Sequence, residues 1–292
     1  MFSRIVLIYK KTLLDIFKEK EYDNILNKPK YPLLKQIKEA HVNHEKSIEI
    51  VKKTLNKINI PTLIYQRGSG RMPILKEDDL LVSLGGDGTF IFSSHHCKNT
   101  KVLGLNSAPL SSIGHYCHPI YPNDKEKLLK LLENILSGAE KPKTIERLDF
   151  FINNQFCGIP VLNDVLVSEK SPCTTTRYML EFNDKSYSQK SSGIWIATAT
   201  GSSAAFQSAG GKVFTEKSKT KQKQYGFQVR ELYKKTKDSM TGALVNEKDH
   251  FKIISGMATG FIFLDGSHRF FPFTFGEELT IKFSKYPLFV YR

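Results

Sequence analysis

Residues 80–89 read Leu80-Leu81-Val82-Ser83-Leu84-Gly85-Gly86-Asp87-Gly88-Thr89. The apolar run that ends at Leu84 is typical of a buried β-strand, and the glycines after it predict a turn into a helix. Glycine allows backbone angles that other residues resist, and it lets a phosphate approach the main-chain N–H groups at a helix N-terminus. The stretch therefore predicts a phosphate-binding loop, with a glycine-rich turn capped by an Asp side chain as the plain structural alternative.

The loop differs from the two commonest phosphate-binding motifs. It lacks the Lys and Ser/Thr pair of a Walker loop, and it does not fit the G-x-G-x-x-G pattern of dinucleotide dehydrogenases. Asp87 would repel a phosphate unless its carboxylate contacts a hydroxyl group or a metal ion. Both uses belong to phosphoryl transfer, in which a carboxylate can accept the proton of the attacking hydroxyl.

The first half of the chain alternates short apolar runs with helical patterns. Such alternation predicts βαβ units around a parallel sheet, and hence a Rossmann-like α/β domain over residues 1–143. The expected strands cover residues 5–9, 62–66, 80–84 and 102–105, and the expected helices cover residues 12–26, 37–58 and 124–136.

From residue 145 onward the pattern changes to short β-like runs separated by polar and glycine turns. This predicts a second, mainly antiparallel, sandwich-like β domain over residues 144–275, followed by a C-terminal strand or tail, 276–292, for which a return to the first domain is one option. A helix is expected near residues 227–235, and Trp195 is expected in the core or at an interface. The expected strands cover residues 149–152, 161–167, 178–182, 194–198, 261–264, 270–275 and 279–283.

The charge balance is strongly basic. Lys and Arg number 43 against 29 Asp and Glu, and a net charge of +14 attracts polyanions such as nucleic acid, an acidic membrane or a nucleotide. The densest basic run, Lys217, Lys219, Lys221 and Lys223, has no interleaved aromatic residues, so it predicts a solvated loop rather than a nucleic-acid groove. No apolar stretch approaches the roughly 20 residues that a membrane span needs, so we expect no membrane partner.

The distribution of the four cysteines indicates the redox state of the cellular compartment. They are spread along the chain without a C-x-x-C pair, and the N-terminus enters the first strand without a signal-peptide pattern. We therefore expect reduced thiols in a cytoplasmic protein. The spacing of the His and Cys residues fits no standard zinc pattern, so no protein-bound metal is expected.

Three motifs carry a family resemblance. Gly85-Gly86-Asp87-Gly88-Thr89 resembles the GGDGT signature that NAD kinases share with diacylglycerol- and sphingosine-type lipid kinases. Leu162-Asn163-Asp164-Val165 is similar to the N-E/D motif of NAD kinases, and residues 198–204 are similar to their T-P-T-G-S-T-A loop. Shorter likenesses at residues 114–117, 168–171 and 190–193 are to the divergent mitochondrial-type branch. The resemblance runs in order from residue 4 to about 211, with a weaker likeness at Leu264-Asp265-Gly266, and it implies an NAD kinase-like fold.

The resemblance also implies an activity and a site. The activity is transfer of the γ-phosphoryl group of ATP, bound with Mg²⁺, to the 2′-hydroxyl of the adenosine ribose of NAD or NADH, in a cleft between the domains. The implied partners are nucleotides and dinucleotides, with a homodimer or homotetramer as the assembly. The proton acceptor would be Asp87, and the binding residues would be Gly85, Gly86, Gly88, Thr89, Asn163, Asp164, Lys190, Ser192, Thr200, Ser203, Ala204 and Ser208.

Two positions depart from the family pattern. Ser192 stands where the common family has Asp, and Ala205 stands where an aromatic residue is usual. Because Phe206 follows, a stacking platform is either lost or shifted by one residue.

Two other functions stay open. A lipid kinase is favoured by the GGDGT signature but opposed by residues 198–204 and by the lack of an amphipathic membrane helix. A non-catalytic dinucleotide-binding regulatory protein is opposed by the retention of Asp87 and of Asn163-Asp164. The sequence does not choose between NAD and NADH, or between ATP and polyphosphate as the donor.

Overall fold

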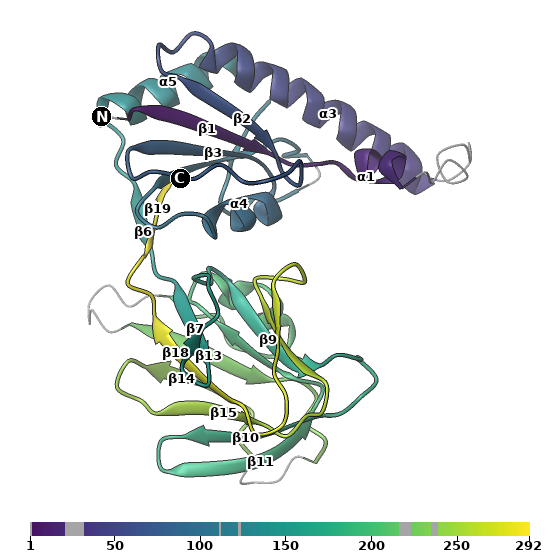
Figure 1. The fold of residues 1–292 in the computed structure, drawn as a ribbon. Coiled ribbons are helices and arrows are strands. Elements are labelled where there is room, and N and C mark those ends of the chain that lie inside the picture. The colour runs from purple at the N-terminus through teal and green to yellow at the C-terminus, as the bar shows by residue number, and fades with distance from the viewer. Residues whose placement is uncertain (1, 21–31, 111, 122–123, 216–222, 235–238) are drawn as a thin grey trace. The chain divides into compact units, whose positions relative to one another are not determined.

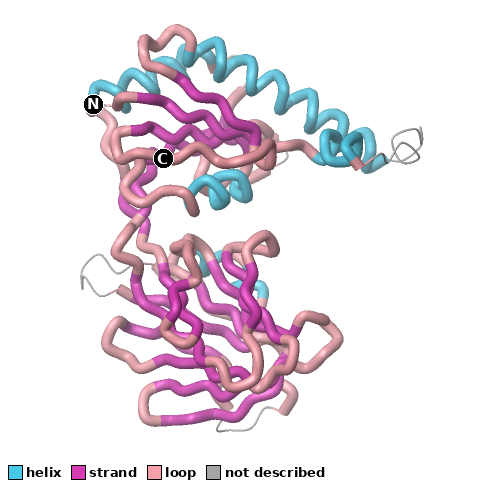
Figure 2. Tube along the Cα trace, in the orientation of Figure 1, coloured by secondary structure: helices cyan, strands magenta, loops and turns pink. Residues whose placement is uncertain are grey.

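The computed structural model describes residues 2–20, 32–110, 112–121, 124–215, 223–234 and 239–292. The chain divides into two compact units (Figure 1). Unit 1 consists of Met1–Thr144 together with Leu288–Arg292, and unit 2 consists of Ile145–Pro287. The long helices belong to unit 1, whereas strands fill most of unit 2 (Figure 2).

Unit 1 is built on a parallel sheet with the strand order β2-β1-β3-β4-β19-β6, and β5 lies beside β4. The pairs β1–β2, β1–β3, β3–β4, β4–β19 and β4–β5 are all parallel, which confirms the predicted α/β organisation. The strands are β1 (Arg4–Tyr9), β2 (Thr62–Gln66), β3 (Asp79–Gly85), β4 (Lys101–Asn106), β5 (His118–Pro119), β6 (Lys143–Ile145) and β19 (Leu288–Tyr291).

Helices cover both faces of this sheet. The helices α3 (Pro32–Leu55) and α5 (Lys125–Ser137) lie on one face, and α4 (Asp87–Ser94) lies on the other (Figure 1). Apolar stripes of α3 and α5 pack against buried strand residues such as Ile5 and Leu7. The expected end of α5 is confirmed, because Gly138 takes the left-handed conformation with φ 78°. A short helix, α1 (Leu13–Glu19), follows β1.

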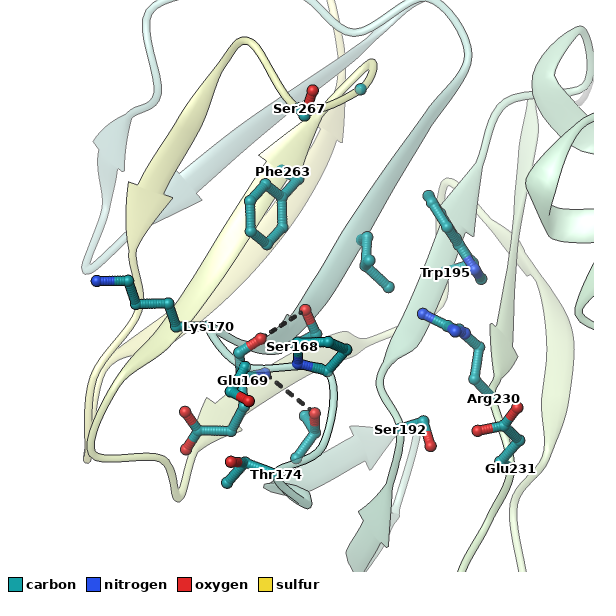
Figure 3. Close-up of a pocket in the computed structure, with 15 residues that line it drawn as sticks. Ser168, Glu169, Lys170, Thr174, Ser192, Trp195, Arg230, Glu231, Phe263 and Ser267 are labelled. Carbon is teal, nitrogen blue, oxygen red and sulfur yellow. Dashed lines mark hydrogen bonds between the residues drawn. The ribbon is translucent and has the colours of Figure 1, made fainter.

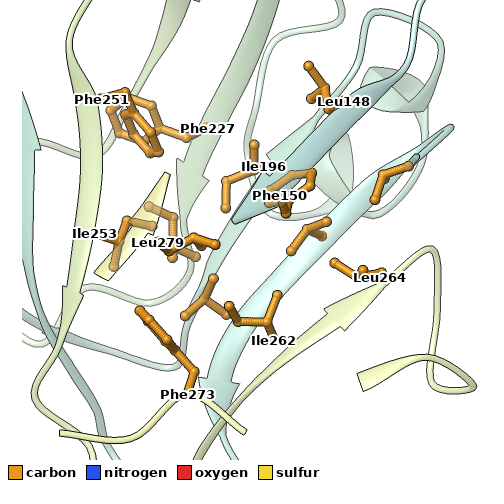
Figure 4. Packing of buried hydrophobic residues seen from close by; sticks show 14 of the residues in the cluster. Leu148, Phe150, Ile196, Phe227, Phe251, Ile253, Ile262, Leu264, Phe273 and Leu279 are labelled. Atoms are coloured by element: carbon orange, nitrogen blue, oxygen red, sulfur yellow. The ribbon is translucent and has the colours of Figure 1, made fainter. Parts of the chain in front are cut away.

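Unit 2 is a pair of antiparallel sheets, which confirms the predicted β-rich domain. Their inner faces share one core, in which Phe150, Ile253 and Leu279 of the first sheet meet Ile196 and Ile262 of the second (Figure 4). The first sheet, in spatial order, is β11 (Lys185–Ser191), β10 (Thr176–Phe182), β15 (Phe251–Ser255), β18 (Glu278–Phe283), β7 (Leu148–Ile152) and β8 (Gln155–Phe156). The second is β14 (Gly242–Asn246), β13 (Gln224–Val229), β12 (Ile194–Ala197), β9 (Asp164–Glu169), β16 (Gly260–Leu264) and β17 (Phe270–Pro272).

The structure corrects one prediction in unit 2. The helix expected near residues 227–235 is wrong, because β13 occupies Gln224–Val229 and pairs with β12 and β14. The side chains of Tyr225, Phe227 and Val229 are buried at alternate positions, and Gln224 and Gln228 are less buried, which is the period-2 pattern of a strand.

Three further predictions concern the basic run, the C-terminal segment and the membrane. Residues Lys217, Lys219 and Lys221 of the basic run lie outside the described residues. The segment 276–292 is divided between the units, since β18 pairs with β7 and β15 in unit 2 and β19 pairs with β4 in unit 1. Among the helices of the described ranges, none has the length and apolarity to cross a membrane.

Candidate functional site

The glycine-rich loop joins β3 to α4 at the carboxyl edge of the parallel sheet. β3 is buried along its whole length, and α4 begins at Asp87 with Gly86 as its N-cap. The connection after β1 leads to β2 on one side, whereas the connection after β3 leads to β4 on the other side. Such a reversal of strand order at the carboxyl ends of β1 and β3 is the usual ligand position in sheets of this kind.

Asp87 is tied to the loop that follows β4. Its Oδ2 accepts the backbone N–H of His115 at 2.9 Å, and its Oδ1 accepts the backbone N–H of Tyr116 at 3.0 Å. These two bonds fix the orientation of the carboxylate, which is partly exposed. Each carboxylate oxygen has two lone pairs, so Asp87 can still accept a hydroxyl proton in this orientation.

The glycines of the loop do not supply the unusual backbone angles that the sequence predicts. None of Gly85, Gly86 and Gly88 has a positive φ. Gly85 is required by close packing, because an added Cβ would lie 2.6 Å from Oγ1 of Thr89. Gly88 is exposed and faces open space, which leaves room for a phosphate at the N-terminus of α4.

Two cationic residues that the sequence analysis missed flank this loop. Lys10 follows β1, and its backbone N–H donates to the carbonyl of Leu84 at 3.0 Å. Arg67 follows β2, donates from Nη1 to the carbonyl of Gly88 at 3.0 Å and places its guanidinium over the Phe92 ring at 4.7 Å. Burial lowers the pKa of both side chains, which marks them as partly desolvated cations. The signal was available, because each directly follows a predicted parallel strand.

A buried histidine supports the backbone of Lys10. Nε2 of His44, from α3, lies 3.1 Å from the carbonyl oxygen of Lys10 and donates its proton to it. Burial, reinforced by the nearby Lys10 charge, lowers the pKa of His44 to about 4, so the ring is neutral at neutral pH. A neutral donor therefore anchors the carboxyl end of β1 without adding charge to this edge of the sheet.

In unit 2 the Asn163-Asp164 segment is held against the Thr198–Gly201 loop. The Thr198 hydroxyl donates to the carbonyl of Leu162 at 2.7 Å, and its backbone N–H donates to the carbonyl of Asn163 at 2.9 Å. A Cβ on Gly201 would lie 2.1 Å from that same Asn163 oxygen, so only glycine fits there. The structure thus brings together the two motifs that the sequence separates by more than thirty residues.

Asp164 has an unusual environment for a carboxylic acid. It is 8% exposed, and burial together with the negative charge of Asp265 raises its pKa to about 7. A carboxyl group that is half-protonated near neutral pH can both donate and accept a hydrogen bond. Such a group can satisfy a ribose hydroxyl in either direction.

The loop after β12 presents most of its predicted binding residues to solvent. It forms a 3₁₀ turn, Gly201–Ser203, and a short helix, α6 (Ala205–Ser208). Ser203, Ala204 and Ser208 are exposed, and Thr200 is partly exposed. Phe206 is 3% exposed and packs against Phe214 and beneath Gly211 and Gly226, so the option that it replaces the family's stacking platform is wrong.

The remaining two predicted binding residues lie elsewhere in unit 2. Lys190 is exposed on β11, whereas Ser192 lines a cavity of about 370 Å³ with Trp195, Arg230 and Phe263 (Figure 3). Trp195 therefore contributes to a cavity wall rather than to the core. Ser192 lies near the Ser168 end of β9 and Asp164 at its start, a separation of roughly 13 Å along the strand. Ser192 and Asp164 therefore belong to two separate groups of predicted binding residues.

No cluster of three or more His, Cys, Asp or Glu side chains suited to a metal ion occurs among the described residues. Cys97, Cys117, Cys157 and Cys173 are free thiols. The polar groups of the two regions are backbone N–H groups, cations, carboxylates and hydroxyls, a chemistry suited to nucleotides.

Comparisons of the sequence with known proteins point to one group of enzymes. No family model matches the chain. A probable NADH kinase from Oryza sativa subsp. japonica is 28% identical over 262 residues, which cover 82% of this chain and 78% of the relative. An NAD kinase from Prosthecochloris aestuarii is 30% identical over 146 residues, which cover 49% of each chain.

Two solved structures share the fold over almost the whole chain. An NAD kinase from Archaeoglobus fulgidus, in complex with ATP, aligns with a TM-score of 0.67 and 16% identity, covering 99% of this chain and 93% of the other. Yeast NADH kinase complexed with NADH aligns with a TM-score of 0.61 and 18% identity, covering 99% and 83%. The chain is therefore similar in sequence to NAD kinases and NADH kinases, and it shares their fold.

Proposed function

We propose that the chain is an ATP-dependent NAD(H) kinase. It transfers the γ-phosphoryl group of ATP to the 2′-hydroxyl of the adenosine ribose of NAD or NADH, and releases ADP, a proton and NADP or NADPH. The observation that carries the proposal is the arrangement of Asp87 and the open Gly88 at the carboxyl edge of the sheet. The relatives named NAD kinase and NADH kinase support the same activity.

Asp87 is the proposed proton acceptor. Its two bonds to the backbone of His115 and Tyr116 hold the carboxylate in one orientation, so a ribose hydroxyl can approach without a side-chain rearrangement. As the O–P bond forms and the bond to ADP breaks, the hydroxyl proton moves to Asp87.

The phosphates of ATP are the proposed ligands of the loop and its cations. The N-terminus of α4 offers backbone N–H groups and a partial positive charge, with Gly85, Gly86, Gly88 and Thr89 as its loop residues. Lys10 and Arg67 add two full positive charges on neighbouring strand ends. ATP brings Mg²⁺ with it as part of the substrate, and the ion offsets the phosphate charge that Asp87 would otherwise repel.

The dinucleotide is the proposed ligand of unit 2. Asn163 and Asp164 offer an amide and a carboxyl group to the adenine and the ribose, and the exposed hydroxyls of the following loop can satisfy the edge of the base. The residues in this proposal are Asn163, Asp164, Lys190, Ser192, Thr200, Ser203, Ala204 and Ser208.

The proposal is tested by a direct assay. The purified chain is incubated with ATP, Mg²⁺ and either NAD or NADH, and the product is detected with a dehydrogenase specific for NADP(H). Formation of NADP or NADPH supports the kinase and also shows which dinucleotide is preferred. No product with either dinucleotide, from a chain that still binds NAD, would instead favour a non-catalytic regulatory protein.

Arg67 provides a sharper test of the phosphate assignment. We expect Arg67→Ala to lower kcat/KM for ATP by about 10- to 100-fold, since charge-assisted contacts to phosphate are among the stronger polar interactions. Arg67→Lys should recover little of this loss, because an ammonium group cannot reproduce the planar guanidinium stacked on Phe92. The measurement is a steady-state titration of ATP at saturating NAD.

A matched control is available in the same loop. Arg71 is exposed, so Arg71→Ala removes the same charge four residues away and should leave kcat/KM for ATP within about twofold of the wild type. Equal losses in the two variants would mean that net charge, and not the placement of Arg67, determines the effect.

The assembly and the compartment are proposed on independent features. A homodimer or homotetramer is supported by the outer face of the second sheet of unit 2, where Phe261 and Phe263 contact Phe270, which is 54% exposed. A cytoplasmic location is supported by the free thiols, which a reducing compartment preserves. Light scattering of the purified chain and fractionation of the source cells test these two proposals.

A further inference from the structure

The turn after β16 carries a carboxylate in a strained backbone position. Asp265 follows Leu264, the last residue of β16, and has φ 51°, in the left-handed region that non-glycine residues rarely adopt. A backbone of this kind persists only where the surrounding contacts determine it. The following residue, Gly266, also has a positive φ.

Four hydrogen bonds tie Asp265 to the segment Leu162–Asp164. Oδ2 of Asp265 accepts the backbone N–H of Leu162 at 2.8 Å, and Oδ1 accepts the N–H groups of Asn163 at 2.7 Å and Asp164 at 3.1 Å. The backbone N–H of Asp265 donates in turn to the carbonyl of Asp164 at 2.9 Å. One residue therefore engages three consecutive N–H groups that lie about a hundred positions earlier in the chain.

The opposite side of the same segment is held by other residues. Its carbonyl oxygens accept from Thr198, and Gly201 packs directly against Asn163. The N–H groups of the segment thus point to Asp265, and the carbonyl oxygens of Leu162 and Asn163 point to the loop after β12. With the backbone fixed on both sides, the directions of the Asn163 and Asp164 side chains are fixed as well.

We infer that Asp265 is a positioning residue for dinucleotide binding: its carboxylate holds the Leu162–Asp164 backbone so that the Asn163 and Asp164 side chains meet the adenosine ribose. This inference rests on the proposed function and extends it to a residue outside the three motifs that carry the main resemblance. Asp265 acts through the segment and does not itself contact the substrate.

The chemistry requires a charged carboxylate in this position. Hydrogen bonds to an ionised acceptor are roughly twice as strong as neutral ones, and two carboxylate oxygens can accept all three N–H groups. An Asn side chain offers one acceptor oxygen and turns an NH₂ group toward the remaining N–H. The negative charge of Asp265 also contributes to the raised pKa of Asp164.

The test is a pair of ligand titrations on the full chain. NAD and ATP are each titrated calorimetrically into the wild type and into Asp265→Asn, and thermal unfolding is followed for both proteins. We expect the Kd for NAD to rise by at least about tenfold in the variant, while the Kd for ATP changes by less than about twofold. If Asp265→Asn does not fold, Asp265→Glu is used in its place. This variant keeps the charge but displaces the carboxylate, and it should show the same selective loss of NAD affinity.

Asp249 supplies the matched control. Its carboxylate accepts the backbone N–H of Asn246 at 2.7 Å in the turn between β14 and β15 of the same unit, so Asp249→Asn removes a comparable turn-stabilising carboxylate. This variant should bind NAD and ATP as the wild type does, even if its melting temperature falls.

The possible results distinguish a failure of the role of Asp265 from a failure of the proposed kinase function. Wild-type affinity for NAD in the Asp265 variants, with or without a lower melting temperature, would overturn the inference and reduce Asp265 to a structural role. Equal weakening of NAD and ATP would overturn it as well. A wild-type chain that binds no dinucleotide would overturn the proposed function together with the inference.

Discussion

Asp87→Asn is expected to lower the kcat for NAD phosphorylation by about 10²- to 10⁴-fold, the usual contribution of a general base. The Asn amide cannot accept the hydroxyl proton, although its oxygen can still accept one of the N–H groups of His115 and Tyr116. The KM for ATP should change only a few-fold, because the proposed phosphate contacts come from the loop backbone and from Arg67, which lies beside Gly88.

The measurement is a steady-state titration of both substrates, with thermal unfolding to confirm that the loop after β4 is retained. Asp78→Asn is the matched control, because Asp78 is an exposed carboxylate just before the opposite end of β3. It should retain wild-type kcat. An Asp87→Asn enzyme that keeps more than about a tenth of the wild-type kcat would contradict the role of Asp87 as the proton acceptor.

The second large effect concerns pH and the stability of unit 2. The pKa of Asp164 is raised to about 7 in the folded state by burial and by Asp265, whereas its ordinary value in an unfolded chain is about 3.9. Between these two values the folded state holds a proton that the unfolded state has lost, so stability falls as the pH rises through this window. Well inside this window each pH unit lowers the free energy of unfolding by about 1.4 kcal/mol, and the loss between pH 5 and pH 7 amounts to about 2 kcal/mol.

Asp164→Asn should remove this dependence. Denaturant unfolding is followed at pH 5 and at pH 8 through the fluorescence of Trp195, the chain's single tryptophan, which lies in β12 beside β9. From pH 5 to pH 8, the free energy of unfolding of the wild type should fall by about 3 kcal/mol more than that of the variant. Asp184→Asn, at an exposed position before β11, should follow the wild type. Parallel pH profiles for wild type and Asp164→Asn would refute the assignment.

The fold was largely predictable because its strands are marked by local patterns. The apolar run 80–84 and the change of texture at residue 145 correspond to β3 and to the start of unit 2. The helix predicted near Phe227 failed because the basic, polar surroundings hid the alternation of Tyr225, Phe227 and Val229. The division of residues 276–292 between the two units depends on pairings with distant strands, which no local pattern encodes.

The candidate site was predictable only where its residues form short motifs. The loop around Asp87 and the Asn163-Asp164 pair are each a short run of consecutive residues, so each could be found in the sequence alone. Asp265 was noticed only as a faint likeness, because its partners lie about a hundred positions away. Arg67 carries no motif at all, and its place beside Gly88 follows from the order of the parallel strands.

The late return of the chain to unit 1 has a consequence for biosynthesis. β19 pairs with β4 and separates it from β6, yet the ribosome makes β19 only after every residue of unit 2. Unit 2 is contiguous and can fold as it emerges, whereas the buried edge of β4 must wait for Val290 and its neighbours. Nascent unit 1 therefore displays an unpaired apolar strand edge during this interval, and we expect it to depend on chaperones more than unit 2 does.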